Sequence, residues 1–118
     1  MKDLRKFYIN GEWVDPTHSN DLDVENPASE EMIATISLGG QTDVNLAVAA
    51  AKRAFASYSQ TSVDERIALM EKLLQLYMER YDEISVAISV EMGAPISFAT
   101  AAHADTGRGH INAALEAL

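Results

Sequence analysis

Cysteine is absent from this 118-residue chain, which excludes disulfide bonds, thiolate-ligated metal centres and a thiol nucleophile within it. Positive charge is scarce, because nine Lys and Arg stand against 18 Asp and Glu, giving a net charge of −9. No Lys or Arg occurs between Lys6 and Lys52. Phosphate backbones and anionic lipid surfaces are bound through cations, so the sequence predicts no nucleic-acid partner and no membrane partner.

Long apolar runs are also missing. The charged N-terminus, Met1 to Lys6, leads into only a short apolar stretch and does not resemble a signal peptide. Nothing approaches the roughly 18 consecutive apolar residues of a membrane span. We therefore expect a cytoplasmic protein of one modest domain.

The clearest local pattern is Phe-Tyr-Ile-Asn-Gly-Glu-Trp-Val at residues 7 to 14. Asn10-Gly11 supplies the two positive φ angles of a type I′ turn, so the segment predicts a β-hairpin. A two-residue loop pairs Tyr8 with Trp13 on one face, where an aromatic pair helps to hold the register.

Two more strands are expected before residue 40. Residues 22–25 alternate apolar and acidic side chains, residues 26–29 form a turn, and residues 32–37 are rich in β-branched side chains. Gly39-Gly40 ends the last strand. This pattern predicts a small antiparallel meander and not a parallel sheet.

After Gly40 the apolar period becomes helical. Thr42 is the expected N-cap of a first helix, with Asp43 in its first turn. Ser62-x-x-Glu65 is a capping box that opens a second helix. A short third helix, capped by Asp82, ends before Gly93, which suits a left-handed C′ position. A last helix begins at Pro95 and is weakened by Gly107 and Gly109.

The expected fold class is therefore α+β and mostly helical. Residues 1–40 form the hairpin and meander, and residues 41–118 form a helical segment of three to four helices. We expect the two parts to make up one partial domain.

No residue pattern in the chain supports catalysis or cofactor binding. There is no G-x-S-x-G, and neither Gly39-Gly40 nor Gly107-x-Gly109 is a phosphate loop, so both are predicted to be breaks or packing points. His103 and His110 are seven residues apart, which favours packing or solvent exposure over metal ligation. The acidic stretch from Asp15 to Glu31 lacks the spacing of a calcium loop and is predicted to be a solvated surface.

Several short motifs, in their order, resemble the N-terminal segment of the aldehyde dehydrogenase superfamily. They are Ile9-Asn10-Gly11-Glu12-Trp13, Asn26-Pro27-Ala28 with Met32-Ile33-Ala34, the alanine-rich helix from Asp43 to Phe55, Arg66 and Leu69 with the leucines that follow, and Glu91-x-Gly93-x-Pro95. The resemblance is good from Phe7 to Pro95 and weak after it. Ala94 and Tyr58 depart from the usual Lys and Trp, at positions that do not carry catalysis in the family.

The resemblance implies NAD- or NADP-dependent oxidation of an aldehyde to a carboxylate. In the family a cysteine thiolate attacks the aldehyde, hydride passes to the nicotinamide, and a glutamate activates the water that releases the acid. Those residues and the cofactor loop lie beyond this chain, in agreement with its missing cysteine. It is then a truncated N-terminal fragment from the outer part of the cofactor-binding domain. On its own it is catalytically incompetent and binds no cofactor, whereas the full-length enzyme forms a homo-oligomer.

The resemblance also implies two sites. A monovalent cation site uses the backbone near Val24 and Glu25 and the acid of Glu91. Thr106 falls where the last helix lines the aldehyde tunnel. The alternatives are a solvated, empty pocket for the first and plain packing for the second.

Two other functions are compatible with parts of the sequence. A free-standing acidic helical protein-interaction module would explain the amphipathic helices, and an acidic cation-buffering module would explain the charge. Neither explains the ordered motifs, and the last helix reaches Leu118 without a capping signal, which is unlike a complete domain.

Overall fold

A computed structural model describes residues 1–118. By their contacts these residues group into two compact units, Met1–Glu25 with Glu30–Gln60, and Asn26–Ser29 with Thr61–Leu118. The helix after Gly40 thus groups with the strands, and a four-residue turn groups with the later helices. The division at residue 40 stays a prediction.

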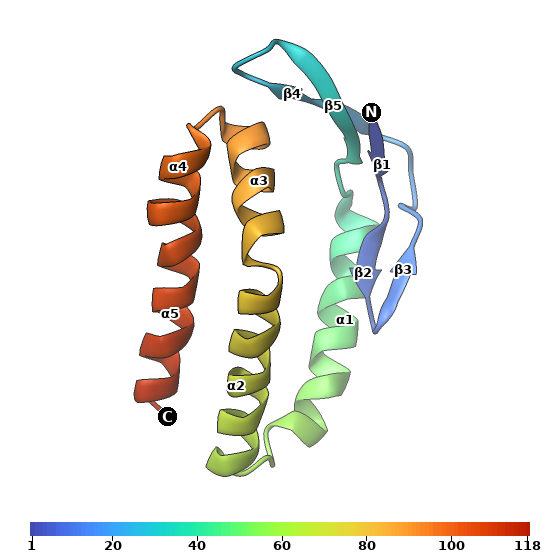
Figure 1. The fold of residues 1–118 in the computed structure, drawn as a ribbon. Coiled ribbons are helices and arrows are strands. Elements are labelled where there is room, and N and C mark those ends of the chain that lie inside the picture. The colour runs from blue at the N-terminus through green and yellow to red at the C-terminus, as the bar shows by residue number, and fades with distance from the viewer. The chain divides into compact units, whose positions relative to one another are not determined.

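The first unit contains short strands and one long helix. Its elements are β1 (Lys2–Leu4), β2 (Phe7–Ile9), β3 (Glu12–Val14), β4 (Asp21–Asn26), β5 (Glu31–Ser37) and α1 (Gln41–Tyr58). All of the predicted strands are present, and β1 is an additional one. Figure 1 shows the β2–β3 hairpin beside α1.

The predicted hairpin is confirmed in its register. Tyr8 pairs with Trp13, and Phe7 pairs with Val14. Asn10 and Gly11 have φ angles of 57° and 83°, as a type I′ turn requires. The rings of Tyr8 and Trp13 have centroids 5.3 Å apart. The local sequence therefore determines this element.

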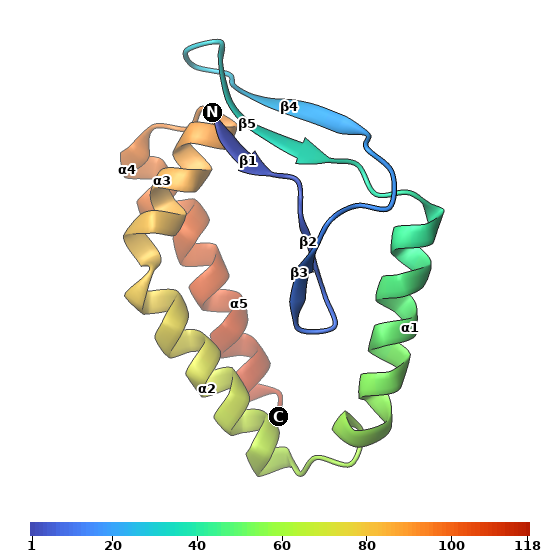
Figure 2. The same ribbon diagram turned by 90° about the vertical axis from the view of Figure 1, so that its right-hand side faces the viewer.

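The second sheet corrects the prediction of an antiparallel meander. Its strand order is β1-β5-β4, and β1 runs parallel to β5, with Lys2 opposite Ala34 (Figure 2). β4 and β5 are joined by the expected turn. The parallel pair was missed because it joins residues about thirty positions apart, with no turn motif to mark it.

The beginning of α1 also differs from the prediction. Gly40, not Thr42, is the N-cap residue. The carboxylate of Asp43, three residues on, accepts the Gly40 N–H at 2.9 Å. Gly40 has no side chain with which to accept an N–H of the first turn, and only the reciprocal half of a capping box, from Asp43 to the Gly40 N–H, is present.

The second unit is a set of helices and a turn. Its helices are α2 (Val63–Glu79), α3 (Tyr81–Met92), α4 (Ile96–Phe98), the π-helix η1 (Ala99–Ala104) and α5 (Asp105–Glu116). In Figures 1 and 2 the continuous run of α4, η1 and α5 lies alongside α2 and α3. Two predictions need correction here: η1 interrupts the expected single last helix, and Pro95 precedes α4 as its N-cap.

The ends of α2 and α3 are mostly as predicted. Glu65 N–H donates to the Ser62 hydroxyl at 3.2 Å, and Ser62 N–H donates to the Glu65 carboxylate at 2.7 Å, which completes the capping box. Gly93 ends α3 with a φ of 71°. Asp82 is not a cap, because Arg80 occupies that position and Asp82 lies in the first turn.

Small residues form the buried core. The buried apolar side chains are Ala34 and Ala50 in the first unit, and Ala99 and Ala104 in the second. Alanine permits close approach of backbones but removes little apolar area from water. None of the helices is long and apolar enough to cross a lipid bilayer.

Candidate functional site

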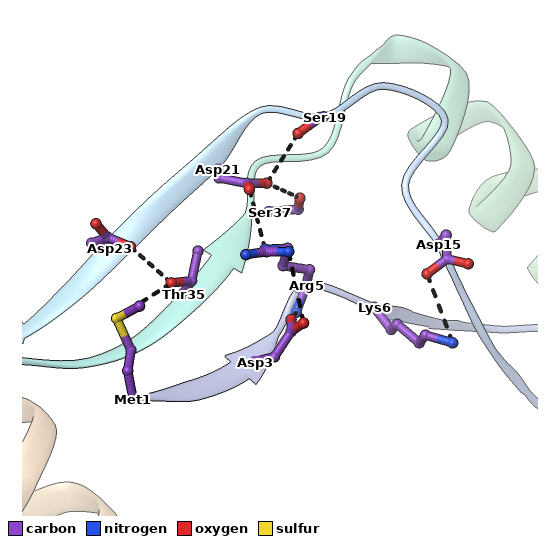
Figure 3. Close-up of polar contacts among 10 residues, drawn as sticks. All are labelled: Met1, Asp3, Arg5, Lys6, Asp15, Ser19, Asp21, Asp23, Thr35 and Ser37. Carbon is purple, nitrogen blue, oxygen red and sulfur yellow. Dashed lines mark hydrogen bonds and ion pairs between the residues drawn. The ribbon is translucent and has the colours of Figure 1, made fainter.

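A polar cluster joins the strands of the three-stranded sheet β1-β5-β4 (Figure 3). The buried Thr35 hydroxyl on β5 donates to Asp23 Oδ1 on β4 at 2.8 Å. The buried Ser37 hydroxyl donates to Asp21 Oδ1 at 3.0 Å. Arg5 Nε reaches Asp21 Oδ2 at 3.1 Å. Because these acids already have partners within the sheet, the cluster holds strands together.

An open groove of about 700 Å³ lies beside this cluster in the first unit. Its lining residues are Asp3, Leu4, Arg5, Lys6, Trp13, Asp15 and Pro16. The two cations that line the groove have acidic partners. Lys6 Nζ lies 3.7 Å from Asp15 Oδ1, and Arg5 Nη1 lies 3.7 Å from Asp3 Oδ2. The groove is therefore lined by the apolar side chains of Leu4, Trp13 and Pro16 and by charged side chains that pair with one another.

Asp43 is the most constrained acid in the first unit. It is 5% exposed, and its two oxygens accept the backbone N–H groups of Thr17 and Gly40, each at 2.9 Å. The Thr17 N–H, and then the Gly40 N–H, lower the pKa of Asp43, whereas burial opposes them. Asp43 therefore stays ionised and ties the loop after β3 to the start of α1.

Two motifs of the resemblance lie against each other in the second unit. Asn26 Oδ1 accepts the Ala28 N–H at 2.9 Å and closes the Asn-Pro-Ala turn. Pro27 Cγ lies 2.8 Å from the point where a Cβ on Gly93 would stand. The turn thus covers the end of α3, and only glycine leaves room for it.

Two tyrosines contact the π-helix. The Tyr81 hydroxyl donates to the Thr100 carbonyl at 2.6 Å, and the Tyr77 hydroxyl donates to the Ala104 carbonyl at 2.7 Å. Their rings meet edge to face with centroids 6.2 Å apart. Burial, followed by the nearby charge of Asp105, raises the pKa of Tyr81, so its hydroxyl keeps the proton that it donates.

The predicted cation-site residues fall in different units. Val24 and Glu25 lie on β4, where Val24 is half-buried and Glu25 is exposed. Glu91 is exposed near the end of α3. No three His, Asp or Glu side chains are grouped so as to hold a metal ion. That finding does not test a site built partly from backbone carbonyls, which stays a prediction.

Thr106 is the second residue of α5, directly after the π-helix. Its side chain is exposed, and its hydroxyl donates to the Ala102 carbonyl at 2.8 Å. His103, which we expected to pack, has its ring edge-on to Phe98 with centroids 5.0 Å apart. The tunnel role of Thr106 stays a prediction.

One glycine of each pair lies against a neighbouring side chain. A Cβ on Gly39 would stand 3.5 Å from the Phe7 ring, and a Cβ on Gly107 would collide with the Tyr77 hydroxyl. The Gly40 N–H, which an anion would need, already donates to a carboxylate. The packing role predicted for Gly39 and Gly107 is confirmed.

The chain matches a known family along most of its length. The model of the aldehyde dehydrogenase family matches residues 13–118. The order of strands followed by helices matches the N-terminal part of the cofactor-binding region in these proteins. The chain therefore belongs to the aldehyde dehydrogenase family.

Individual relatives agree with this assignment. The chain is 45% identical over 111 residues to 3-succinoylsemialdehyde-pyridine dehydrogenase of a Pseudomonas species, which covers 93% of this chain and 23% of that protein. It superimposes on the crystal structure of aldehyde dehydrogenase from Bartonella henselae with a TM-score of 0.97 and 45% identity, over 99% of this chain and 25% of the other. A Cys-to-Ala variant of aldehyde dehydrogenase C from Pseudomonas syringae, complexed with NAD+ and octanal, gives a TM-score of 0.92 at 41% identity, over 95% and 23%.

The chain spans about a quarter of the length of the relatives it matches. Family membership was predictable from the ordered motifs, but the roles of Tyr77 and Tyr81 were not. Nothing in the sequence pattern marks which carbonyls their hydroxyls reach.

Proposed function

We propose that this chain is the N-terminal part of an NAD- or NADP-dependent aldehyde dehydrogenase that oxidises an aldehyde to a carboxylate. The observation that carries the proposal is the family match over residues 13–118. The relative solved with NAD+ and octanal supports the choice of cofactor and of substrate class. The full-length protein is then an oxidoreductase and a homo-oligomer.

The part played by these 118 residues is structural. Side chains pack against Gly39 and Gly107, and the acids Asp43 and Asp23 accept hydrogen bonds within the fold. We expect the chain on its own to be catalytically incompetent and to bind neither NAD nor NADP tightly, because it has no thiol nucleophile and no phosphate loop.

The experiment compares the full-length protein with the isolated chain. Each is incubated with NAD or NADP and a panel of short, long and aromatic aldehydes, and the reduced cofactor is followed by its absorbance. The proposal requires turnover by the full-length protein and none by the chain. An inactive full-length protein together with stable capture of another protein by the chain would favour the interaction module.

Thr106 is our proposed contact with the aldehyde. Thr106→Leu in the full-length enzyme should change the ratio of kcat/KM values between short and long aldehydes by roughly tenfold. That is about the effect that one extra or missing methylene group has on discrimination in an apolar site. The KM for the cofactor should stay unchanged. Ala113→Leu, an exposed position on the same helix, is the matched control. An equal change in both variants would argue against the assignment.

The cation proposal concerns Val24, Glu25 and Glu91. A carboxylate near the negative end of a helix suits a monovalent cation with oxygen ligands. Potassium should raise the melting temperature of the full-length protein, and Glu91→Gln should abolish that increase. A melting temperature that is independent of potassium would remove the site.

A further inference from the structure

The run of α4, η1 and α5 has an unusual set of hydrogen bonds. Four side-chain hydroxyls donate to its carbonyls: Thr100 to Ile96 O at 2.9 Å, Tyr81 to Thr100 O at 2.6 Å, Thr106 to Ala102 O at 2.8 Å and Tyr77 to Ala104 O at 2.7 Å. A π-helix replaces the normal ladder with wider bonds, and it needs side chains to satisfy the carbonyls that it releases. Two of the four donors come from the neighbouring helices.

We propose that Tyr77 and Tyr81 are positioning residues whose hydroxyls hold residues 99–104 as a π-helix and thereby fix the rotation of α5 about its axis. Where it concerns substrate choice, the proposal rests on the proposed function, because the rotation of α5 determines which way Thr106 faces. Nothing in the sequence pattern of residues 96–116 requires a π-helix. We therefore attribute the π-helix to contacts from α2 and α3.

Gly107 shows why the rotation matters. A Cβ at this position would collide with the Tyr77 hydroxyl and would stand 2.8 Å from Cζ of the ring. The π-helix accommodates one extra residue in its turn. If residues 99–104 formed a regular α-helix instead, each later residue would move by one place, which is a rotation of about 100° about the helix axis. Thr106 would then take the place of Gly107, against Tyr77, where its Cβ cannot fit. The glycine and the tyrosine therefore select the same register.

The hydrogen bonds and the glycine act together on one element. Tyr77 lies near the end of α2, and Tyr81 begins α3. The two tyrosines are four residues apart, and so are the Thr100 and Ala104 carbonyls that accept their hydrogen bonds. Tyr81 keeps its hydroxyl proton because burial raises its pKa. The Ala99 and Ala104 side chains, both fully buried, bring the backbone of η1 close enough for the hydroxyls to reach it.

The test uses four variants of the full-length protein: Tyr77→Phe, Tyr81→Phe, the double variant, and the double variant with Ala101 deleted. Ala101 is exposed and lies inside the π-helix, so its deletion removes the extra residue while keeping Gly107 opposite the ring of residue 77. Tyr8→Phe, on the exposed hairpin, is the matched control. Hydrogen exchange of the amides in residues 99–106 is the first measurement.

We expect exchange in residues 99–106 to become roughly thirtyfold faster in the double variant, as loss of two hydrogen bonds worth about 1 kcal/mol each implies. Deletion of Ala101 should restore slow exchange, and Tyr8→Phe should have no effect. A merely structural role for the tyrosines would slow or speed exchange throughout the second unit and would not be rescued by a deletion. Unchanged exchange in the double variant would overturn the proposal.

Aldehyde kinetics form the second measurement. The double variant should change KM for long against short aldehydes by several-fold, with KM for NAD unchanged, because α5 rotates and carries Thr106 with it. Faster exchange without a change in aldehyde preference would overturn the link to substrate choice. If the unaltered full-length protein oxidises no aldehyde, the proposed function fails, and the exchange data still decide whether the tyrosines hold the π-helix.

Discussion

At Gly93 two independent constraints exclude a side chain. Its φ of 71° is left-handed, and Pro27 Cγ would lie 2.8 Å from an added Cβ. We predict that Gly93→Ala lowers the free energy of unfolding by about 1–3 kcal/mol, from backbone strain and from displacement of the Asn-Pro turn. Urea unfolding of the chain measures this loss.

Gly109→Ala is the matched control for that substitution. No atom lies within 4 Å of its added Cβ, and its φ is not positive. In a helix interior alanine is favoured over glycine, so this variant should gain up to about 1 kcal/mol. A loss at Gly109 equal to that at Gly93 would show that the Pro27 contact is unimportant.

Asp43 makes a prediction about pH. Because the Thr17 and Gly40 N–H groups lower the pKa of its carboxyl, ionised Asp43 stabilises the folded chain above the ordinary carboxyl pKa of about 4. That stability is lost as the pH falls from about 4 through the lower, folded-state pKa. Asp43→Asn should therefore reduce the melting temperature at pH 7, and the reduction should become smaller as the pH falls below about 4. A reduction of the same size at every pH would contradict the role of the charge.

Among the elements, the β2–β3 hairpin gives the most local test. Gly11 has a φ of 83° and no neighbouring atom within 4 Å of its added Cβ, so only backbone strain opposes a side chain there. Gly11→Val should destabilise the chain by roughly 1–2 kcal/mol, since a β-branched residue resists positive φ. Gly11→Asn, which tolerates this region, should cost much less. Thermal unfolding compares the two, and equal losses would contradict the type I′ turn.

Elements whose determinants are close in the sequence were predictable. The Asn10-Gly11 turn, the Ser62 to Glu65 capping box and the left-handed Gly93 each depend on residues within four positions. The family was predictable for a different reason, because the order of several weak motifs along the chain is itself specific.

Elements fixed by distant partners were not predictable. β1 depends on β5, and Lys2-Asp3-Leu4 shows no apolar alternation that would mark a strand. The π-helix depends on hydroxyls from Tyr77 and Tyr81, more than 15 residues away. The predicted N-cap of α1, Thr42, is two residues later than the observed one. Gly40 has no capping side chain that would mark it in the sequence, and the hydrogen bond at this end comes from the Asp43 carboxylate.

At the scale of the whole molecule, large apolar side chains remain in contact with water. On α1, Val44, Val48 and Phe55 are 51%, 47% and 66% exposed, while the fully buried apolar residues are all alanines. Exposed apolar surface of this extent usually finds a partner. The isolated chain should therefore be strongly helical, bind an apolar dye and associate with further copies of itself.

Light scattering and a helical circular dichroism spectrum test this together. Replacing Val48 and Phe55 by Lys should lower the mass found by scattering and the binding of dye, and leave the helical signal in place. Replacing the exposed but polar Gln41 and Asn45 by Lys is the matched control. A monodisperse monomer that binds no dye would contradict the prediction and favour a self-contained interaction module.

Neither compact unit is a single continuous stretch of chain. The backbone passes from one to the other after Glu25, after Ser29 and after Gln60, because the Asn-Pro turn groups with the helices. A gene divided at residue 60 would consequently yield a helical product without the four residues that cover Gly93. A synthetic peptide containing Asn26–Ser29 is therefore the complement to residues 61–118, and a protease that cut only between residues 60 and 61 would leave those four residues on the product that ends at Gln60.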